Sequence, residues 1–385
     1  MYFPLSDAEL RVREMVRDFV EKEVRPGVAE RDREGKFPYE LWRRISELGL
    51  TGIPFPEEYG GSAAGWMSFI LAVEEISRVD PSLAATYMVS TNVAGILNEA
   101  GTHEQKIRWM VPLVQGTHIG AFGLTEPHGG SDNRAMRTTA TLDNGEWVIN
   151  GSKAFITNCG TDISLFVIVF CVTGRREDGR KEYSAIIVPL DSKGLTVLPA
   201  YRKLGWHSSD THPLVFEDCR VPAENLLGER GQGLRLALGM LTFGRVVIAA
   251  SALGLAQGCL EECLRYAHDR HAFGRPIGSF QGMRFTLADM ATEIEAGRLM
   301  VYQATRAFEQ GKLTRRDASM VKLFVTEMAQ RVAVTACDFF GGMGFMDEMP
   351  VARFYRDVKV MTIGDGTANI QRYIIAKDLN LPPEP

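Results

Sequence analysis

The chain of 385 residues has no excess of basic residues and no cysteine grouping that suits a disulfide framework or a zinc site. It carries 43 Lys and Arg against 48 Asp and Glu, so the charge needed to neutralise nucleic-acid phosphates is missing. Its six cysteines form no Cys-x-x-Cys pair and no zinc-like cluster with its seven histidines. The thiols are therefore expected to be reduced, as in the cytoplasm or another reducing compartment.

Membrane-directing segments are also missing from the sequence. The first residues, Met1-Tyr-Phe-Pro-Leu-Ser-Asp7, lack the basic and apolar regions of a signal peptide. No apolar stretch is expected to be long and uncharged enough to span a bilayer. With 45% hydrophobic and 24% charged residues, the composition is that of a globular protein with a large core and no membrane partner.

Several familiar nucleotide-binding and hydrolase signatures do not occur. No glycine fingerprint follows a predicted strand and opens a helix with an acid downstream, which argues against a Rossmann NAD site. Walker A and Gly-x-Ser-x-Gly motifs are absent as well, and no internal repeat is present. The chemistry of this chain must therefore come from other motifs.

Hydrophobic periodicity divides the chain into three predicted domains. Residues 1–117 are predicted to form an all-helical domain, whose first helix opens with a capping box made by Ser6 and Glu9. Residues 118–228 alternate in polarity and are predicted to form a small antiparallel sheet or barrel. Residues 229–385 return to helical periodicity with few interior Gly or Pro, which predicts a helical bundle.

Local signals place turns and helices within these domains. Asp143-Asn-Gly145 and Asn150-Gly151 both lie between β-branched runs, so each is predicted to be a hairpin turn. The predicted helices of the last domain cover residues 234–270, 280–310 and 315–340, with a shorter one after Thr367.

Residues 361–372 place a single carboxylate, Asp365, between two glycines and directly before Thr367, a good helix N-cap. Backbone N–H groups at a helix start suit an anion or the oxyanion of a polarised carbonyl. A poorly solvated acid there has a raised pKa, as a proton-abstracting base requires. The alternative interpretation is a plain Asp-Gly turn that caps a helix.

Two segments of the middle domain offer groups for a planar cofactor. Gly120 begins a stretch that includes Thr125 and Ser131, whose hydroxyls could line the polar edge of a cofactor. Alternatively, this stretch is a strand that ends in a Pro/Gly turn. Phe155 and Thr157 stand two residues apart, so on a strand they share one face and could flank a ring system. A half-buried strand explains the same spacing equally well.

Two segments of the last domain suit a diphosphate or a neighbouring chain. Residues 270–277 combine two arginines, a histidine and an aromatic between long predicted helices, which suits a diphosphate, although a solvated turn is the alternative. Gly341 and Gly342 follow a long helix, either as its C-cap or as a place where another chain's cofactor lies against the backbone.

Seven segments occur together in an order and spacing that resemble the acyl-CoA dehydrogenase family. The resemblance covers nearly the whole chain, and the set as a whole is highly specific. The segments that carry it are Pro56-Glu-Glu-Tyr-Gly-Gly61, Leu124-Thr-Glu-Pro-His-Gly-Gly-Ser-Asp132, Asn150-Gly-Ser-Lys-Ala-Phe-Ile-Thr-Asn158, Lys203-Leu-Gly-Trp-His-Ser-Ser-Asp210, residues 216–228, residues 270–276 and Gly364-Asp-Gly-Thr367.

The resemblance implies an α+β fold: an N-terminal α-helical domain, a middle antiparallel β-barrel or sandwich domain and a C-terminal four-helix bundle. FAD is expected between the middle domain and the bundle, completed by a neighbouring subunit of a homotetramer. The implied enzyme oxidises an acyl-CoA in fatty acid or carboxylic acid degradation and passes electrons to an electron-transfer flavoprotein.

The resemblance also assigns binding roles to individual positions. It implies that Phe122, Leu124 and Thr125 meet the edge of the flavin ring, and that Phe155 and Thr157 cover its other side. The remaining residues implied in FAD binding, several of them reaching the FAD of the partner subunit, are Ser131, Arg270, Phe273, Gln281, Asp338, Gly342, Thr367 and Asn369. The residues implied in substrate binding are Ser131, Thr242, Arg245 and Gly366, with Arg245 ordering the pocket near the base.

Four positions depart from the common family pattern. Asp365 falls where most members carry Glu as the base, and Gly244 offers no substitute acid from the bundle helix. Asp338 stands where Gln is usual, Asn369 where Gln or Glu is usual, and Thr242 where Asp is common. These three differences affect single contacts to the cofactor or CoA and not the fold.

By resemblance, Asp365 abstracts the α proton of the thioester while the β hydrogen leaves as a hydride to flavin N5, giving the α,β-enoyl-CoA. Its backbone N–H and an FAD ribityl hydroxyl are expected to receive the thioester oxygen. Asp is one methylene shorter than Glu and also occurs in cyclohexanecarboxyl-CoA dehydrogenases and nitroalkane oxidases. The resemblance thus favours a cyclic or branched acyl-CoA over a straight one.

Three other functions share this sequence pattern. A nitroalkane-oxidase-like flavoenzyme would use Asp365 as base without CoA. A flavin-binding relative without catalysis would serve as a stress or nucleic-acid-binding protein, against which the acidic net charge of -5 speaks. A reductase running the reaction backward would have the same site.

Overall fold

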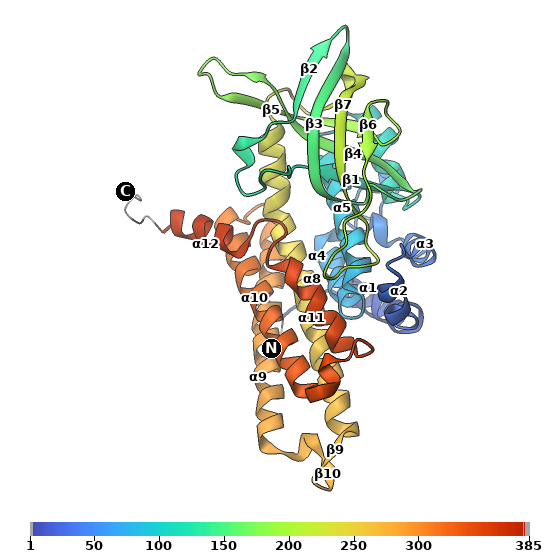
Figure 1. Cartoon of the computed structure of the whole chain (residues 1–385), viewed down its shortest axis with the longest axis vertical. Helices are drawn as coiled ribbons and strands as arrows, with labels where there is room; N and C mark the ends of the chain where they lie inside the picture. Colours follow the sequence, from blue (N-terminus) through green and yellow to red (C-terminus); the bar gives the residue numbers. More distant parts are fainter. Residues whose placement is uncertain (1–2, 380, 382–385) are drawn as a thin grey trace.

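The computed structural model describes residues 3–379 and 381. Figure 1 shows an elongated molecule with the sheet at one end and long helices running to the other. The N-terminal helices pack along one side of these long helices, below the sheet. This arrangement of helical, sheet and helical parts is the one that the sequence predicts.

The first part of the chain is helical throughout, and its capping box is confirmed: the Ser6 hydroxyl accepts from the Glu9 N–H and the Glu9 carboxylate from the Ser6 N–H. Asp80 caps the longest of these helices with its side chain alone, accepting from the N–H groups of Ser82 and Leu83. The α-helices are α1 (Asp7–Phe19), α2 (Val28–Glu34), α3 (Tyr39–Glu47), α4 (Gly65–Ser77), α5 (Pro81–Ala100), α6 (His103–Gln105) and α7 (Val111–Val114).

Eight strands form one sheet in the order β6-β7-β3-β2-β4-β5-β8, with β1 beside β4. The predicted antiparallel sheet is confirmed for five of the seven strand pairs, but β4 pairs in parallel with β1 and, at one position, with β2. A strand that enters from a helix and runs alongside β4 cannot be read from hairpin signals alone. The strands are β1 (Ile119–Gly123), β2 (Thr139–Asp143), β3 (Glu146–Thr157), β4 (Ser164–Arg175), β5 (Lys181–Pro189), β6 (Leu195–Val197), β7 (Thr211–Pro222) and β8 (Leu226–Leu227).

Only one of the two predicted hairpin turns is a turn. Asn144 and Gly145 join β2 to β3 with positive φ angles of 52° and 84°, as the Asp-Asn-Gly signal predicts. Asn150 and Gly151 instead lie inside β3, where the register against β7 shifts and Gly151 takes a φ of 139°. The Asn150 side chain exchanges hydrogen bonds with Asp218 of β7, so this pair forms a bulge rather than a turn.

The last part of the chain contains the three predicted long helices and one helix that the prediction missed. The missed helix is α11, although Pro350 at its first position and buried residues at Val351, Phe354, Val358 and Met361 are typical of an amphipathic helix. The elements are α8 (Gly233–Asp269), β9 (His271–Ala272), β10 (Arg275–Pro276), α9 (Gln281–Glu309), α10 (Arg315–Phe340), α11 (Pro350–Met361) and α12 (Ala368–Lys377).

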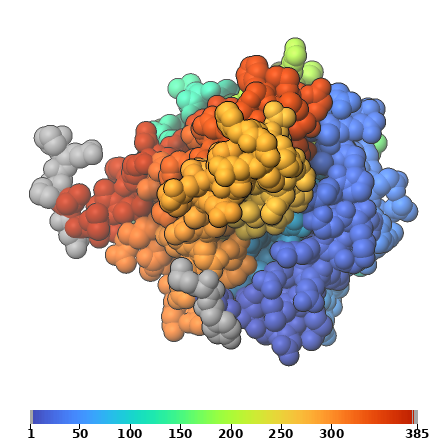
Figure 2. Space-filling view, turned by 90° about the horizontal axis from the view of Figure 1, so that it is seen from below, coloured from blue at the N-terminus to red at the C-terminus, as the bar shows by residue number. Residues whose placement is uncertain are grey.

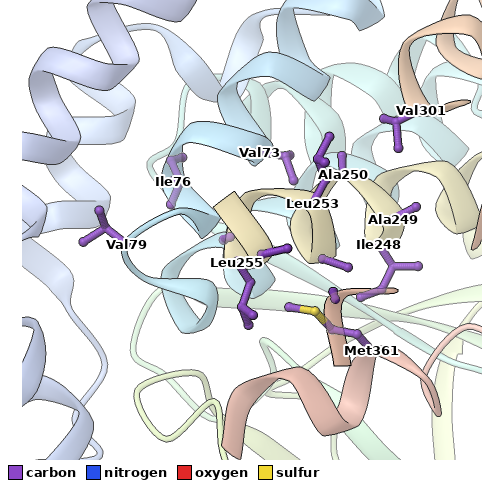
Figure 3. Packing of buried hydrophobic residues seen from close by; sticks show 14 of the residues in the cluster. Val73, Ile76, Val79, Ile248, Ala249, Ala250, Leu253, Leu255, Val301 and Met361 are labelled. Atoms are coloured by element: carbon purple, nitrogen blue, oxygen red, sulfur yellow. The ribbon is translucent and has the colours of Figure 1, made fainter. Parts of the chain in front are cut away.

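Helix α8 forms the centre of the core. Figure 3 shows apolar side chains of α8 among those of neighbouring helices, with Leu253 on the side of Val73 of α4 and Ile248 on the side of Met361 of α11. By length and composition α8 could cross a membrane, so the expectation that no such stretch exists is wrong. However, 78% of its most apolar window is buried inside the protein, which is what a core helix surrounded by other helices requires.

Candidate active site

The candidate base lies on a tight turn between α11 and α12. Asp365 has a backbone φ of 53° and Gly366 a φ of 90°, so two successive residues are in the left-handed region. Thr367 caps α12 by accepting from the Ile370 N–H at 3.4 Å, as predicted. A non-glycine residue keeps such a conformation only where surrounding contacts hold it.

Two buried side chains make these contacts. The Lys322 ammonium, on α10, donates to the carbonyl oxygen of Gly364 at 2.5 Å and to that of Gly366. The Gln371 amide, on α12, donates to the carbonyl oxygens of Gly366 at 2.8 Å and Asp365 at 3.3 Å. Lys322 is 1% exposed and Gln371 is fully buried, so the turn is held from inside the protein.

The charges of two cations act on the Asp365 carboxylate. Removal from water raises the pKa of Asp365, while the charges of Lys322 and Arg245 oppose that rise. Burial lowers the pKa of Lys322 to about 8. Burial and the nearby Arg315 lower the pKa of Arg245 to about 10, and its Nε and Nη1 atoms have no hydrogen-bond partner within the described chain. The base is thus poorly solvated and flanked by positive charge.

The Asp365 carboxylate opens onto the surface of α8. A Cβ atom added at Gly244 would lie 3.8 Å from the Asp365 Oδ2 and 3.9 Å from the Nδ2 of Asn92, on α5. The carboxylate and this amide therefore border the same space over Gly244. Thr242, assigned to the substrate by resemblance, lies two residues before Gly244 on α8 and donates its hydroxyl to the Leu238 carbonyl at 2.9 Å.

The segment that follows β1 carries the residues assigned to the flavin edge. Phe122 and Thr125 are half-buried and Leu124 is buried. The glycine-rich loop folds back over them, since a Cβ added at Gly130 would lie 3.2 Å from the Thr125 Cγ2. Ser131, at the end of this loop, is exposed, so its hydroxyl is free to meet a ligand.

A buried ion pair, which the sequence analysis missed, supports this segment. The Lys153 Nζ lies 2.8 Å from the Glu126 Oε1, and both side chains are buried. Lys153 also donates to the Leu124 carbonyl at 3.3 Å. Burial alone would raise the pKa of Glu126, but hydrogen bonds from Lys153 and Thr138 lower this pKa to about 2. The pair ties β3 to the segment after β1.

Phe155 and Thr157 lie at the end of β3, beside another bulge. Phe155 has a φ of 61°, is 65% exposed and places its ring 5.1 Å from that of Tyr201. Ile156 between them is buried while Thr157 is half-buried, which fits the prediction that Phe155 and Thr157 share one face. An exposed aromatic ring held in a strained backbone is a suitable wall for a planar ligand.

A second group of assigned residues surrounds an open cavity of about 690 Å³ at the far end of the bundle. Arg270, Asp338 and Gly342 line it, together with Phe273 on the β9–β10 hairpin, which is 96% exposed. Figure 2 shows the molecule from this end. Two further assigned residues, Gln281 at the start of α9 and Asn369 in the first turn of α12, are exposed.

One chain does not bring these two groups together. In Figure 1 the end of β3 belongs to the sheet end of the molecule, whereas the β9–β10 hairpin is at the opposite tip. Phe122, Thr125, Phe155 and Asp365 therefore cannot meet Phe273 of the same chain around one cofactor. A site that contains both groups needs a second copy of the chain.

The residues present fit a flavin dinucleotide. The exposed Phe155 ring offers a face for a flat ring system. At the other end, added Cβ atoms at Gly341 and Gly342 would meet no heavy atom within 4 Å, so a ligand can lie against that backbone beside the Arg270 guanidinium. Within residues 3–379 and 381, no group of His, Cys, Asp or Glu side chains is placed to bind a metal ion.

Three family models match the chain in succession. They describe the N-terminal domain of acyl-CoA dehydrogenase at residues 6–117, the middle domain at residues 121–219 and the C-terminal domain at residues 231–380. The probable acyl-CoA dehydrogenase YngJ of Bacillus subtilis is 45% identical over 98% of this chain and all of that protein. The short-chain specific acyl-CoA dehydrogenase of Clostridium acetobutylicum is 41% identical over 98% of this chain and 99% of that protein.

Solved structures agree with these relatives. Butyryl-CoA dehydrogenase from Megasphaera elsdenii matches with a TM-score of 0.94 and 40% identity, over 98% of this chain and all of that chain. A chain of a structure described as the electron transferring flavoprotein of Acidaminococcus fermentans matches at 0.94 and 39%, over 99% of this chain and all of that one. Glutaryl-CoA dehydrogenase from Mycobacterium smegmatis in complex with FADH2 matches with a TM-score of 0.91 and 29% identity, over 98% of this chain and 95% of that chain. The chain therefore belongs to the acyl-CoA dehydrogenase family of FAD-dependent oxidoreductases.

Proposed function

We propose that this enzyme dehydrogenates a short acyl-CoA that is branched or cyclic at the α-carbon, with Asp365 as the base. The observation that carries the proposal is the placement of the Asp365 carboxylate, which opens onto Gly244 and is influenced by the charges of Lys322 and Arg245. No other carboxylate borders that space among the neighbours of a Cβ at Gly244. A half-buried acid with a raised pKa is suited to accept a proton from carbon.

The turn supplies both a base and an oxyanion donor from adjacent atoms. The Asp365 carboxylate takes the α proton, and the Asp365 N–H donates to the thioester oxygen as it gains negative charge, which contributes about 3 kcal/mol. FAD, when bound, accepts the β hydrogen with its electron pair. The α,β double bond forms from the electrons left by the proton, so the product is the enoyl-CoA.

The substrate class follows from the space around the carboxylate. Asp is one methylene shorter than Glu, about 1.5 Å of reach, so the α-carbon must come closer to the turn. Gly244 leaves room beside the Asp365 Oδ2, where an α substituent can lie. The relatives named for short-chain acyl-CoA and butyryl-CoA support a short chain.

The cofactor and its surroundings form part of the same proposal. Phe122, Leu124, Thr125, Phe155 and Thr157 hold the flavin of their own chain, while the hairpin and bundle residues assigned by resemblance reach the FAD of a partner. The distance between the two groups in Figure 1 supports this division and a homotetramer built from such pairs. An electron-transfer flavoprotein is the proposed electron acceptor, in line with the matching chain from Acidaminococcus fermentans.

Domain boundaries and location complete the proposal. Domain boundaries at residues 117/118 and 228/229 fall between α7 and β1 and between β8 and α8, in connections outside regular helices and strands. All six cysteines are free and five of them are buried, which suits a reducing compartment such as the cytoplasm.

A nitroalkane-oxidase-like activity is the second candidate, because nitroalkane oxidases and the proposed dehydrogenase share an Asp base at this position. It differs in needing no CoA, since a nitroalkane is acidified by its own nitro group. Turnover of nitroethane in air, without any thioester, distinguishes it.

The test is anaerobic mixing of the holoenzyme with butyryl-CoA, isobutyryl-CoA, cyclohexanecarboxyl-CoA and nitroethane, followed by flavin absorbance. We expect bleaching by the thioesters, fastest with the α-substituted ones. Asp365→Asn lowers the rate about 1,000-fold, because it removes the base. The matched control is Asp378→Asn, an exposed acid at the end of α12. Undiminished bleaching in Asp365→Asn excludes Asp365 as the base.

A further inference from the structure

Lys322 lies directly beneath the turn that carries the base. We propose that Lys322 is a positioning residue of the reaction, whose ammonium fixes this turn and polarises the Asp365 N–H toward the thioester oxygen. The inference rests on the proposed function and adds a role that acts through Asp365. Its basis is the pair of hydrogen bonds from the Lys322 Nζ to the carbonyl oxygens of Gly364 and Gly366, on either side of the base.

The position of Lys322 on α10 is one where an apolar residue is expected. Ala318 and Val325 lie four and three residues away, and Ala329 seven residues away, on the same buried face, and Lys322 itself is 1% exposed. An ammonium in such a place loses its hydration, which is costly unless hydrogen bonds replace the lost water. The hydrogen bonds of the Lys322 ammonium are made to the turn. The charge therefore stabilises the turn and does not contribute to the packing of α10.

The Gly364 carbonyl and the Asp365 N–H are two ends of one peptide group. Resonance couples them, so a cation bound to the carbonyl oxygen withdraws electron density from the nitrogen and makes the N–H a stronger donor. This N–H is the group that meets the thioester oxygen in the proposed function. The ammonium therefore strengthens the oxyanion contact without touching the substrate.

Gln371 provides an internal comparison. Its amide also holds the turn, through the carbonyl oxygens of Asp365 and Gly366. It is neutral and does not contact the Gly364 carbonyl, so it anchors the turn but does not polarise the Asp365 N–H. Loss of Gln371 and loss of Lys322 should loosen the same turn, and only the second should also weaken the oxyanion contact.

The charge of Lys322 also acts on the carboxylate. The charges of Lys322 from α10 and Arg245 from α8 act on Asp365, and the charge of Arg315 acts on Arg245. Without Lys322, one of the two charges that favour the ionised carboxylate is lost. The base then binds its proton at higher pH, so the acid limb of the rate profile moves upward.

The test compares Lys322→Met and Lys322→Gln with the unaltered holoenzyme. Flavin content and Tm establish that each variant is folded. The first measurement is the rate of anaerobic flavin bleaching by saturating acyl-CoA, for which we expect a loss of about 100-fold in Lys322→Met and a smaller loss in Lys322→Gln. The acid limb of this rate shifts upward by about one pH unit, while the Kd of the substrate changes little.

The second measurement does not depend on turnover. An acyl-CoA analogue with sulfur in place of the β-carbon can lose its α proton but no hydride, and its enolate gives a long-wavelength band beside oxidised flavin. We expect this band to need a higher pH in Lys322→Met than in the unaltered enzyme, because the oxyanion donor is weaker. In Gln371→Met the pH midpoint of the band should remain close to that of the unaltered enzyme.

The control for loss of a positive charge is Lys359→Met, on α11, whose exposed ammonium contacts Gln330 and not the turn. A Lys322→Met enzyme that keeps its bleaching rate and its pH midpoint overturns the proposal. An equal shift of the pH midpoint in Lys359→Met or Gln371→Met also overturns it, because such a shift would come from general charge or from packing of the turn. If none of the acyl-CoA thioesters bleaches the flavin of the unaltered enzyme, the proposed function fails instead.

Discussion

The turn around Asp365 and the β9–β10 hairpin are built in opposite ways. At the turn, the carbonyl oxygens of Gly364, Asp365 and Gly366 accept from buried side chains of the same chain. At the hairpin, Phe273 is 96% exposed beside an open cavity. Phe273 lines this cavity together with Phe280 and Met343, and such an exposed apolar patch indicates a surface that something else covers.

This difference indicates which part of the chemistry one chain can hold alone. The turn fixes a base and a backbone donor through short-range contacts that need no other subunit. The hairpin region instead presents the Arg270 guanidinium and the exposed Phe273 ring to an open cavity. The three predictions below test that contrast.

Reversing charge at the hairpin should give the largest effect of the three. Arg270→Glu is expected to weaken FAD binding about 100-fold, because charge-assisted hydrogen bonds to a diphosphate are lost and a repulsive charge replaces them. The measurement is the flavin-to-protein ratio after dialysis, with the oligomeric state measured by light scattering. Arg11→Glu, on the exposed face of α1, is the matched control. Full FAD retention in Arg270→Glu contradicts the role of the hairpin.

Lengthening the base should change specificity while leaving the cofactor in place. Asp365→Glu adds one methylene at the turn and fills part of the space over Gly244. We expect the ratio of kcat/KM for butyryl-CoA to that for cyclohexanecarboxyl-CoA to rise about tenfold, the effect of one methylene in a binding pocket. Flavin content should not change. An unaltered ratio contradicts the proposed link between the Asp base and an α-substituted substrate.

Much of the fold was predictable because the signals are local. The long helices, the Ser6 and Thr367 caps and the turn at Asn144 and Gly145 all follow from periodicity and side-chain chemistry within a few residues. Asn150 and Gly151 carry the same signal as a turn, and only pairing with β7 decides that they form a bulge. Such pairing depends on residues far along the chain.

The candidate site was predictable in part for the same reason. The sequence singles out Asp365, but the two cations that act on its carboxylate come from α8 and α10, far earlier in the chain. Lys322 did leave a signal, since a lysine at helical spacing from Ala318, Val325 and Ala329 stands on an apolar face. The hydrogen bonds it makes could not be predicted, because they depend on how α10 packs beneath the turn.

Removing the second cation at the turn should give the smallest effect. Arg245 bears on Asp365 through its charge, and Nε and Nη1 have no partner in the described chain. Arg245→Met leaves Lys322 as the one remaining cation of the pair facing Asp365, so the pKa of the base rises further above its ordinary value. Because only the ionised carboxylate accepts a proton, the bleaching rate then falls at low pH and recovers at high pH, with a midpoint about one pH unit higher. Arg245→Lys keeps the charge and should keep the midpoint. A midpoint that is the same in all three enzymes would show that the guanidinium does not act on Asp365 through its charge.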